Sequence, residues 1–239
     1  RFVDIIGAFV GLVLAAPVLV PTTIMVWWQD RSYPFYVAPR VGKNQQIFRM
    51  FKLRSMVMNA DQSGVDSTST GDHRITPVGH FIRRFKLDEL TQLWNVLSGD
   101  MSLVGPRPNV KRETDLYTSE ELVLLTVKPG ITDFSSIVFS DEGDILKDRV
   151  DPDLSYNQLI RPWKSRLGIL YVERSSTGLD LNLILLTVVA LVNRRAALHG
   201  VQSILRRIGV DDDMVRVCGR QEELVPHPPP GMTEIVTSR

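Results

Sequence analysis

The chain begins with an uncharged apolar segment, residues 5–28, and continues directly into a polar stretch. As a single helix these 24 residues would be about 36 Å long, enough to cross a bilayer core of ~30 Å. Pro17 lies at the midpoint and Pro21 one turn later, and each proline removes a backbone donor and crowds the preceding turn. The pattern predicts a re-entrant helical hairpin over residues 1–30 that breaks at Pro17.

Two alternatives to the hairpin remain, namely a kinked single span and a signal peptide. The signal peptide is disfavoured because the basic region is thin and no small-x-small cleavage site follows. Charges flank both ends of the segment, with Arg1 and Asp4 before it and Asp30 and Arg31 after it. Flanking charge therefore assigns no sidedness and is compatible with both ends facing the same water.

The pattern then changes to short extended pieces. Residues 34–39 and 47–53, separated by a polar turn at residues 42–44, predict a small β-hairpin. Residues 59–71 have the composition of a surface loop. Apolar residues at three- and four-residue spacing then predict one helix over residues 81–97.

A second apolar stretch, residues 179–192, is too short to span a bilayer and carries Asp180 and Asn182. It leads into residues 193–208, where arginines alternate with apolar residues. This pattern favours a helix lying on a membrane surface, with an amphipathic core helix as the alternative. We therefore predict an α+β fold, mostly helical. Its parts are the hairpin, a catalytic domain over residues 31–192 and an amphipathic helix with a polar tail over residues 193–239.

The distribution of charged residues along the chain indicates which ligands the protein can bind. The net charge is only +1, but residues 31–112 carry 13 Lys or Arg against 6 Asp or Glu. A global basic field for nucleic acid is absent, whereas a local basic region suits phosphorylated ligands or anionic head groups. The single cysteine, Cys218, excludes an intramolecular disulfide and a cysteine-rich zinc site.

The candidate chemistry lies at Asp88 and Glu89, two adjacent acids that follow Arg83. Such a pair persists most readily when a divalent metal or arginines hold it, although by itself it would be an ordinary solvated dipeptide. An ionised Asp can attack phosphorus as a covalent nucleophile, while the Glu can bind metal or manage a proton. The turn at residues 105–108 presents Arg107, whose guanidinium suits phosphate oxygens. No P-loop, dinucleotide fingerprint or HExxH motif occurs.

These segments together resemble the bacterial sugar transferase family, the monotopic phosphoglycosyl transferases. The most specific string is LDELTQLWNVLSGDMSLVGPRP, residues 87–108. The other matching strings are the apolar segment broken at Pro17, PFYVAPRVG (34–42), FKLRSM (51–56), DHRITPVGHFIRR (72–84) and KPGITD (128–133).

The resemblance implies an enzyme of the bacterial inner (cytoplasmic) membrane whose catalytic domain faces the cytoplasm. It implies transfer of a sugar 1-phosphate from a UDP-sugar to polyprenyl (undecaprenyl) phosphate, with Mg²⁺ as cofactor and release of UMP. Asp88 would be the nucleophile and Glu89 its partner acid. Membrane lipids and a possible homodimer are the other expected partners, and no nucleic acid is expected. The expected phosphate and substrate contacts are Arg83, Arg107, Arg40, Arg74 and Lys52, and the expected metal ligands are Asp88, Glu89 and Asp72.

The chain departs from the family pattern at several positions. Thr91 stands where a proline is common, Ala16 replaces the serine before the hairpin proline, and Asp133 stands where many members have glycine. Residues 134–146 follow Asp133, and we expect the identity of the donor sugar to depend on them. A polytopic transferase would need many apolar spans. A membrane scaffold that binds anionic lipids is the non-enzymatic rival, and it predicts that Asp88→Asn leaves function intact.

Overall fold

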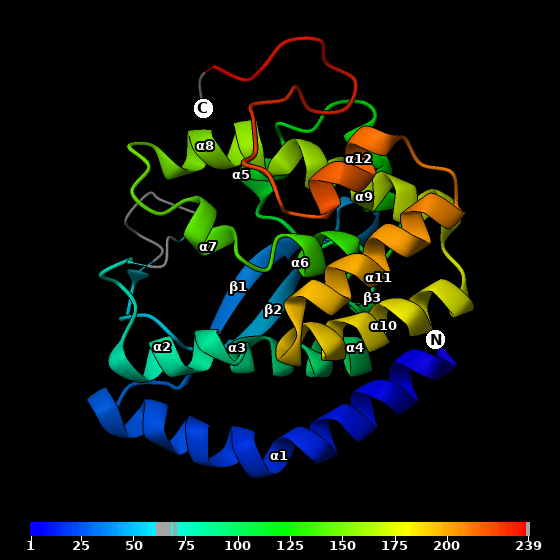
Figure 1. Cartoon of the computed structure of the whole chain (residues 1–239). Helices are drawn as coiled ribbons and strands as arrows, with labels where there is room; N and C mark the ends of the chain where they lie inside the picture. The colour runs from blue at the N-terminus through cyan, green and yellow to red at the C-terminus, as the bar shows by residue number, and fades with distance from the viewer. Residues whose placement is uncertain (61–67, 69–70, 238–239) are drawn as a thin grey trace.

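Helix α1 (Phe2–Asp30) lies along one side of the molecule, and the other elements form a body above it (Figure 1). The computed structural model describes residues 1–60, 68 and 71–237, so most of the predicted loop at residues 59–71 lies outside the described residues. Within these described residues, four strands form two small sheets: β1 (Phe35–Val41), β2 (Ile47–Leu53), β3 (Ser102–Val104) and β4 (Gly130–Thr132). The α-helices of the body are α2 (Pro77–Arg84), α3 (Leu87–Leu90), α4 (Leu93–Ser98), α5 (Lys111–Thr114), α6 (Phe134–Val138), α7 (Glu142–Ile145), α8 (Pro152–Leu159), α9 (Arg161–Arg174), α10 (Thr177–Val192), α11 (Arg194–Arg207) and α12 (Asp212–Cys218). Two 3-10 turns, η1 (Lys43–Gln45) and η3 (Glu121–Thr126), complete the described elements. The predicted mostly helical α+β class is confirmed.

Helix α1 is continuous and bent, where the sequence analysis expected two arms of a hairpin (Figure 1). Pro17 and Pro21 lie inside the helix, and each removes only one helical hydrogen bond. The hydroxyls of Thr22 and Thr23 donate to the carbonyls of Val18 and Leu19, a bond that commonly bends helices. The prolines thus bend the helix without ending it. Among the described helices α1 alone is long and apolar enough to cross a membrane.

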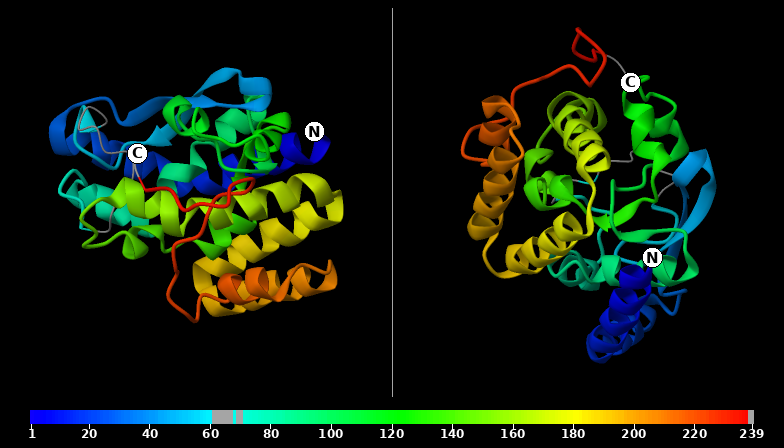
Figure 2. Two further views of the ribbon diagram at one scale, coloured as in Figure 1. Left: turned by 90° about the horizontal axis from the view of Figure 1, so that it is seen from above. Right: turned by 90° about the vertical axis from the view of Figure 1, so that its right-hand side faces the viewer.

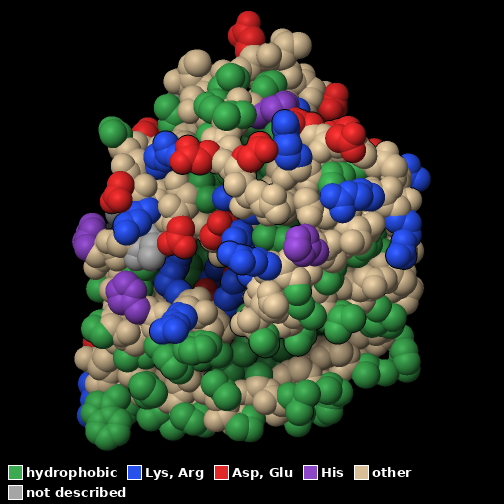
Figure 3. Space-filling view, in the orientation of Figure 1, with side chains coloured by type: hydrophobic (Ala, Val, Ile, Leu, Met, Phe, Trp, Pro, Cys, Tyr) green, Lys and Arg blue, Asp and Glu red, His purple; other side chains and the backbone are tan. Residues whose placement is uncertain are grey.

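Both halves of α1 pack against the body. Ala8 belongs to a buried cluster with Leu93 of α4, and Val26 belongs to a second cluster with Leu87 of α3. Near Ala8 the approach is close, because a Cβ built on Gly7 would lie 2.6 Å from Leu103. The opposite face of α1 is apolar and exposed, and it forms the green lower edge of Figure 3.

Strands β1 and β2 form the predicted hairpin, antiparallel with Tyr36 opposite Lys52 and Arg40 opposite Phe48. This expectation is confirmed because the turn and both strands are local in sequence. The second sheet was not predicted. It pairs β3 with β4 in parallel, and each of these strands has only three residues, too few to show an alternating pattern.

The single helix expected over residues 81–97 is wrong, because the chain forms α2, α3 and α4 there. Lys86 adopts a left-handed conformation with φ 52°, which ends the helical path between α2 and α3. The dyad of Asp88 and Glu89 therefore lies in the first turn of its own short helix, α3.

Helices α9 to α12 form a layer on the side of the body away from β1 and β2 (Figure 2). The apolar stripe of α11, which includes Ala197, Val201 and Leu205, is buried in the same core cluster as Leu167 of α9. Of the two interpretations of residues 193–208, the amphipathic core helix is therefore correct. The membrane-surface interpretation of α11 is wrong because the body already covers its apolar face.

Candidate active site

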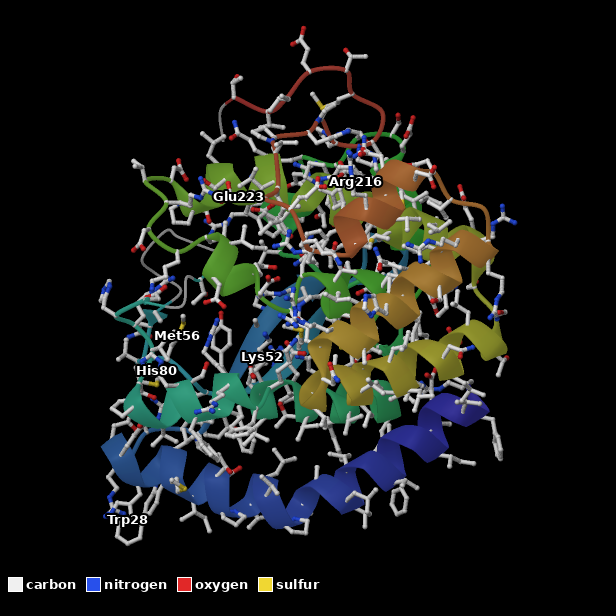
Figure 4. All side chains as sticks on the ribbon, in the orientation of Figure 1. Trp28, Lys52, Met56, His80, Arg216 and Glu223 are labelled. Carbon is white, nitrogen blue, oxygen red and sulfur yellow. The ribbon has the colours of Figure 1, made fainter. Side chains whose placement is uncertain are left out.

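Charged side chains surround a hollow that lies above the apolar edge formed by α1 (Figure 3). Four charged side chains from three separate parts of the chain interact with one another. Lys52 lies on β2, Asp88 and Glu89 lie on α3, and Arg107 follows β3. Figure 4 shows Lys52 between α3 below and α7 above. The fold therefore brings together four residues that the sequence analysis assigned to one site.

The dyad is held by two cations. The Nζ atom of Lys52 lies 3.9 Å from Oδ2 of Asp88, and Nη2 of Arg107 donates to Oε1 of Glu89 at 2.7 Å. Asp88 is buried, with 8% of its surface exposed. Each acid thus has its own cation, which allows two adjacent carboxylates to coexist at low solvent exposure.

The two acids differ in their electrostatic environment. Burial raises the pKa of Asp88, and the positive charges of Lys52, Arg83 and Arg107 only partly oppose this, while Glu89 adds to the rise. Burial also disfavours the Glu89 carboxylate, but Arg107, Lys86 and Lys52 together hold the pKa of Glu89 well below its usual range. This separation favours the ionised form of Glu89 and makes Asp88 the more basic of the two carboxylates.

Burial and neighbouring charges also shift the pKa values of Lys52 and Arg107. Burial, and then repulsion from Arg107, lower the pKa of Lys52 to about 8. The charge of Glu89 raises the pKa of Arg107. Arg107 is therefore a permanent charge, whereas Lys52 titrates near neutral pH.

Asn95, which the sequence analysis did not single out, and Thr91 tie helix α4 and the end of helix α3 to strand β2. Asn95 of α4 accepts from the Phe51 amide at 2.9 Å and donates to the Arg49 carbonyl at 2.7 Å. The Thr91 hydroxyl donates to the Phe51 carbonyl at 3.1 Å. Because Lys52 is the next residue of β2, these bonds set its position relative to Asp88. Thr91 is also the departure from the family's proline, which has no hydroxyl to make this bond.

We expect Asn95→Leu to lower the free energy of unfolding by at least about 2 kcal/mol. Asn95 is fully buried, and its loss leaves the Phe51 amide and the Arg49 carbonyl without their side-chain partner. Thermal and denaturant unfolding of the purified protein measure this change. Ser98→Ala, on the same helix and at a more exposed site, is the control and should change stability by less than about 0.5 kcal/mol. Equal effects of the two substitutions would contradict the assignment.

The turn that carries Arg107 rests on two glycines. The Gly105 amide donates to the Thr132 carbonyl at 2.9 Å, and the Gly130 amide donates to the Pro106 carbonyl at 3.0 Å. A Cβ on Gly130 would lie only 2.0 Å from the Gly105 nitrogen, so no other residue fits there. The motifs at residues 105–108 and 128–133 are thus one structural unit that positions Arg107.

The other predicted residues are divided between two places. Arg83 and Arg40 act electrostatically on the site, Arg83 on Asp88 and Arg40 on Arg107. Asp72 and Arg74 bind each other instead, with Nη2 of Arg74 donating to Oδ2 of Asp72 at 2.6 Å. The roles of Arg74 and Asp72 at the site stay predictions.

The dyad fits the predicted Mg²⁺. This ion is commonly bound through one or two carboxylates, with waters and substrate phosphates completing its shell. Asp88 and Glu89 offer two carboxylates on one short helix, and Arg107 contacts only one oxygen of Glu89. Within residues 1–60, 68 and 71–237, no group of three His, Cys, Asp or Glu side chains gathers that could hold a metal by itself. The donor set therefore suits a cation that enters together with a phosphorylated substrate.

Sequence comparison identifies the family of this chain. The family model for bacterial sugar transferases matches residues 1–194, and the chain belongs to that family. It is 33% identical over 168 residues to the UDP-N-acetylgalactosamine-undecaprenyl-phosphate N-acetylgalactosaminephosphotransferase of Aeromonas hydrophila, covering 68% of this chain and 40% of the relative. It is 31% identical over 171 residues to the UDP-glucose:undecaprenyl-phosphate glucose-1-phosphate transferase of Caulobacter vibrioides, covering 69% and 64%. It is 39% identical over 150 residues to the undecaprenyl-phosphate galactose phosphotransferase of Salmonella typhimurium, covering 55% and 31%. The chain thus spans between about one third and two thirds of these relatives.

Proposed function

We propose that this protein transfers a sugar 1-phosphate from a UDP-sugar to undecaprenyl phosphate through a covalent intermediate on Asp88. The observation that carries the proposal is a buried carboxylate, Asp88, in a cation-lined hollow above an apolar helix. The printed names of the relatives support the reaction class, since all three describe undecaprenyl-phosphate sugar transferases. Their sugars differ, so these names do not select a donor for this chain.

The reaction has two displacements at one phosphorus. In the first, an oxygen of Asp88 bonds to the β-phosphorus of the donor, the bond from that phosphorus to the bridging oxygen breaks, and UMP leaves. In the second, a phosphate oxygen of the polyprenyl carrier bonds to the same phosphorus and displaces Asp88. The products are the polyprenyl diphosphate sugar and the regenerated carboxylate.

The neighbouring residues have distinct tasks in these steps. Lys52 and Arg107 bind the phosphate oxygens and offset the charge that develops on them. Glu89 orients Arg107 through their hydrogen bond. Mg²⁺ held by Asp88 and Glu89 would, when bound, neutralise phosphate charge.

We further propose that α1 is re-entrant, with both ends on the cytoplasmic side of the inner membrane. At its first end, Arg1 donates to the carbonyls of Val96 and Leu97, and Asp4 accepts from the Leu103 amide at 2.9 Å. At its last end, Asp30 accepts two hydrogen bonds from Arg54 at 2.6 and 2.7 Å. Because one polar body binds both ends, a crossing helix would require one set of these contacts to break.

Cysteine labelling tests this arrangement. We expect Phe2→Cys and Tyr33→Cys, each in a Cys218→Ser background, to react with an impermeant maleimide from the same side of sealed membrane vesicles. Both native side chains are exposed, with 77% and 62% of their surfaces accessible. Labelling from opposite sides would establish a single span instead.

The reaction itself is tested by incubating purified protein with Mg²⁺ and a panel of radiolabelled UDP-sugars without lipid acceptor. Intact mass and peptide mapping should show a phosphosugar adduct on Asp88 together with stoichiometric UMP. Added undecaprenyl phosphate should then discharge the adduct. UMP release that requires the acceptor would indicate a single ternary step, and no turnover with any donor would favour the lipid-binding scaffold.

We expect kcat/KM for the donor to fall as pH rises through about 8. Lys52, whose pKa is about 8, is a cation below that pH and loses its charge above it, which weakens phosphate binding. Lys52→Arg should move this limb to higher pH, because a guanidinium stays charged. Lys111→Arg, which changes an exposed lysine of α5, is the control and should leave the profile unchanged. An alkaline limb that Lys52→Arg does not move would assign the titration to another group.

A further inference from the structure

A second charged pair lies at the hollow, on helices that the proposed chemistry does not use. Lys164 of α9 donates from Nζ to Oε2 of Glu142 on α7. The Lys164 ammonium also lies 5.3 Å from the ring centroid of Tyr156 on α8. Both charged side chains remain partly open to solvent, Glu142 with 31% and Lys164 with 17% of its surface exposed. The pair is therefore held in place and accessible.

This pair faces the phosphate-binding cations. The Glu142 carboxylate acts electrostatically on both Arg107 and Lys52, and its effect on Arg107 is larger than that of Asp88. Arg107 thus has a direct ion pair with Glu89 and a longer-range electrostatic interaction with Glu142. Figure 4 shows α7 on the opposite side of Lys52 from α3. Glu142 belongs to α7 and acts on the same cations that we propose for phosphate binding.

The charge of Glu142 needs an explanation, because a carboxylate near a phosphate site repels the substrate. Burial disfavours the ionised form, but Lys164, Arg107 and Lys52 together outweigh burial and lower the pKa of Glu142. Its second oxygen, Oε1, has no hydrogen-bond partner among the residues that the structure describes. An ionised carboxylate with one open oxygen is a strong acceptor for hydroxyl groups.

We propose that Glu142, positioned by Lys164 and Tyr156, binds a hydroxyl group of the UDP-sugar donor. This inference rests on the proposed function and deepens it, since it names the residue that reads the polyhydroxyl part of the donor. The hydroxyl belongs either to the hexose or to the ribose, because both are attached to the diphosphate. In the first case Glu142 determines which sugar is transferred. In the second it determines affinity for every uridine diphosphate donor.

Glu142 also belongs to the segment for which the sequence analysis expected a role in the choice of donor sugar. It lies in residues 134–146, which follow Asp133, and Asp133 begins α6 by accepting from the Ser136 amide at 2.7 Å. This cap fixes the start of the segment that leads to α7.

A double-mutant cycle between protein and donor tests the proposal. The rate of adduct formation is measured for wild type and Glu142→Ala, with UDP-hexoses that each lack one hydroxyl and with a donor that lacks the ribose 2′-hydroxyl. Loss of the hydroxyl that Glu142 binds should lower wild-type kcat/KM by about tenfold or more. Glu142→Ala should lose a similar factor with the complete donor and lose little further with that analogue.

The arms of the cycle separate the two sources of the hydroxyl. Coupling with a hexose analogue assigns Glu142 to sugar selection, and coupling with the 2′-deoxy donor assigns it to the nucleoside. The proposal is overturned if each missing hydroxyl lowers kcat/KM by the same factor in Glu142→Ala as in wild type, because the two changes would then be independent. The proposal is also overturned if Glu142→Ala lowers kcat/KM equally for all donors and lowers the melting temperature. The ion pair between Glu142 and Lys164 would then have only a structural role. Lys164→Met should reduce the coupling while leaving Oε1 present.

Asp213→Asn is the matched control, since Asp213 is an ion-paired carboxylate on α12. Its partner Arg216 lies far from Lys52 in Figure 4, and this substitution should change no donor ratio. Adduct formation by the wild-type protein tests the proposed function separately from the role of Glu142. If wild type forms no adduct with any donor, the proposed function fails, whereas an adduct with uncoupled losses overturns only the role of Glu142.

Discussion

Asp88→Asn should abolish the covalent adduct and lower kcat by at least about 10⁴-fold, because the amide has the shape of the carboxylate without its charge. Both half-reactions should be lost together. The variant should melt no lower than wild type. Burial raises the pKa of Asp88, which means that the folded environment disfavours its ionised form, and a neutral side chain avoids this cost.

Asp115→Asn provides the control for this experiment. Asp115 pairs with Lys111 on the surface and has 55% of its side chain exposed, so its substitution should leave adduct formation unchanged. The measurements are intact mass after incubation with labelled donor, UMP release and thermal unfolding. An adduct that persists in Asp88→Asn would move the nucleophile to another residue. Full activity would favour the scaffold over the transferase.

Arg107→Met should lower kcat/KM by roughly 10²- to 10³-fold, which is the second large effect that we expect. The substitution removes a phosphate contact and also leaves Glu89 without its 2.7 Å partner. The pKa of Glu89 should rise as a result, since Arg107 makes the largest favourable contribution to its charge. Steady-state kinetics across pH should therefore show a new loss of activity on the acid side.

Arg107→Lys is the conservative comparison. It keeps a positive charge but cannot reproduce the planar guanidinium, so we expect a smaller loss that falls mainly on KM. The double variant Arg107→Met/Glu89→Gln should recover stability without recovering activity, because it removes the unpaired acid but not the need for a phosphate cation. Equal kcat/KM in wild type and Arg107→Met would exclude Arg107 from the site.

The elements that were predicted correctly are those whose signal is local. The β1–β2 hairpin follows from two extended segments and the polar turn between them. The two segments pair as antiparallel strands, as expected. The long apolar helix α1 follows from an uncharged run of residues long enough to cross a bilayer core. The path of the chain through residues 81–97 was missed because the apolar spacing continues across Lys86, whose left-handed conformation leaves no mark in that spacing.

The sequence by itself determined the family, the long apolar segment and the acidic dyad, because each is carried by a contiguous string. Only the tertiary structure decided how these parts act together. It brought Lys52 to Asp88 and Arg107 to Glu89, used Asn95 to hold α4 against β2, and attached both ends of a bent α1 to one body. It also joined Glu142 to Lys164 across 22 positions of the chain. Ion pairs and buried hydrogen bonds depend on distances of a few ångströms between separate elements, and those distances arise only when the apolar faces of these elements pack.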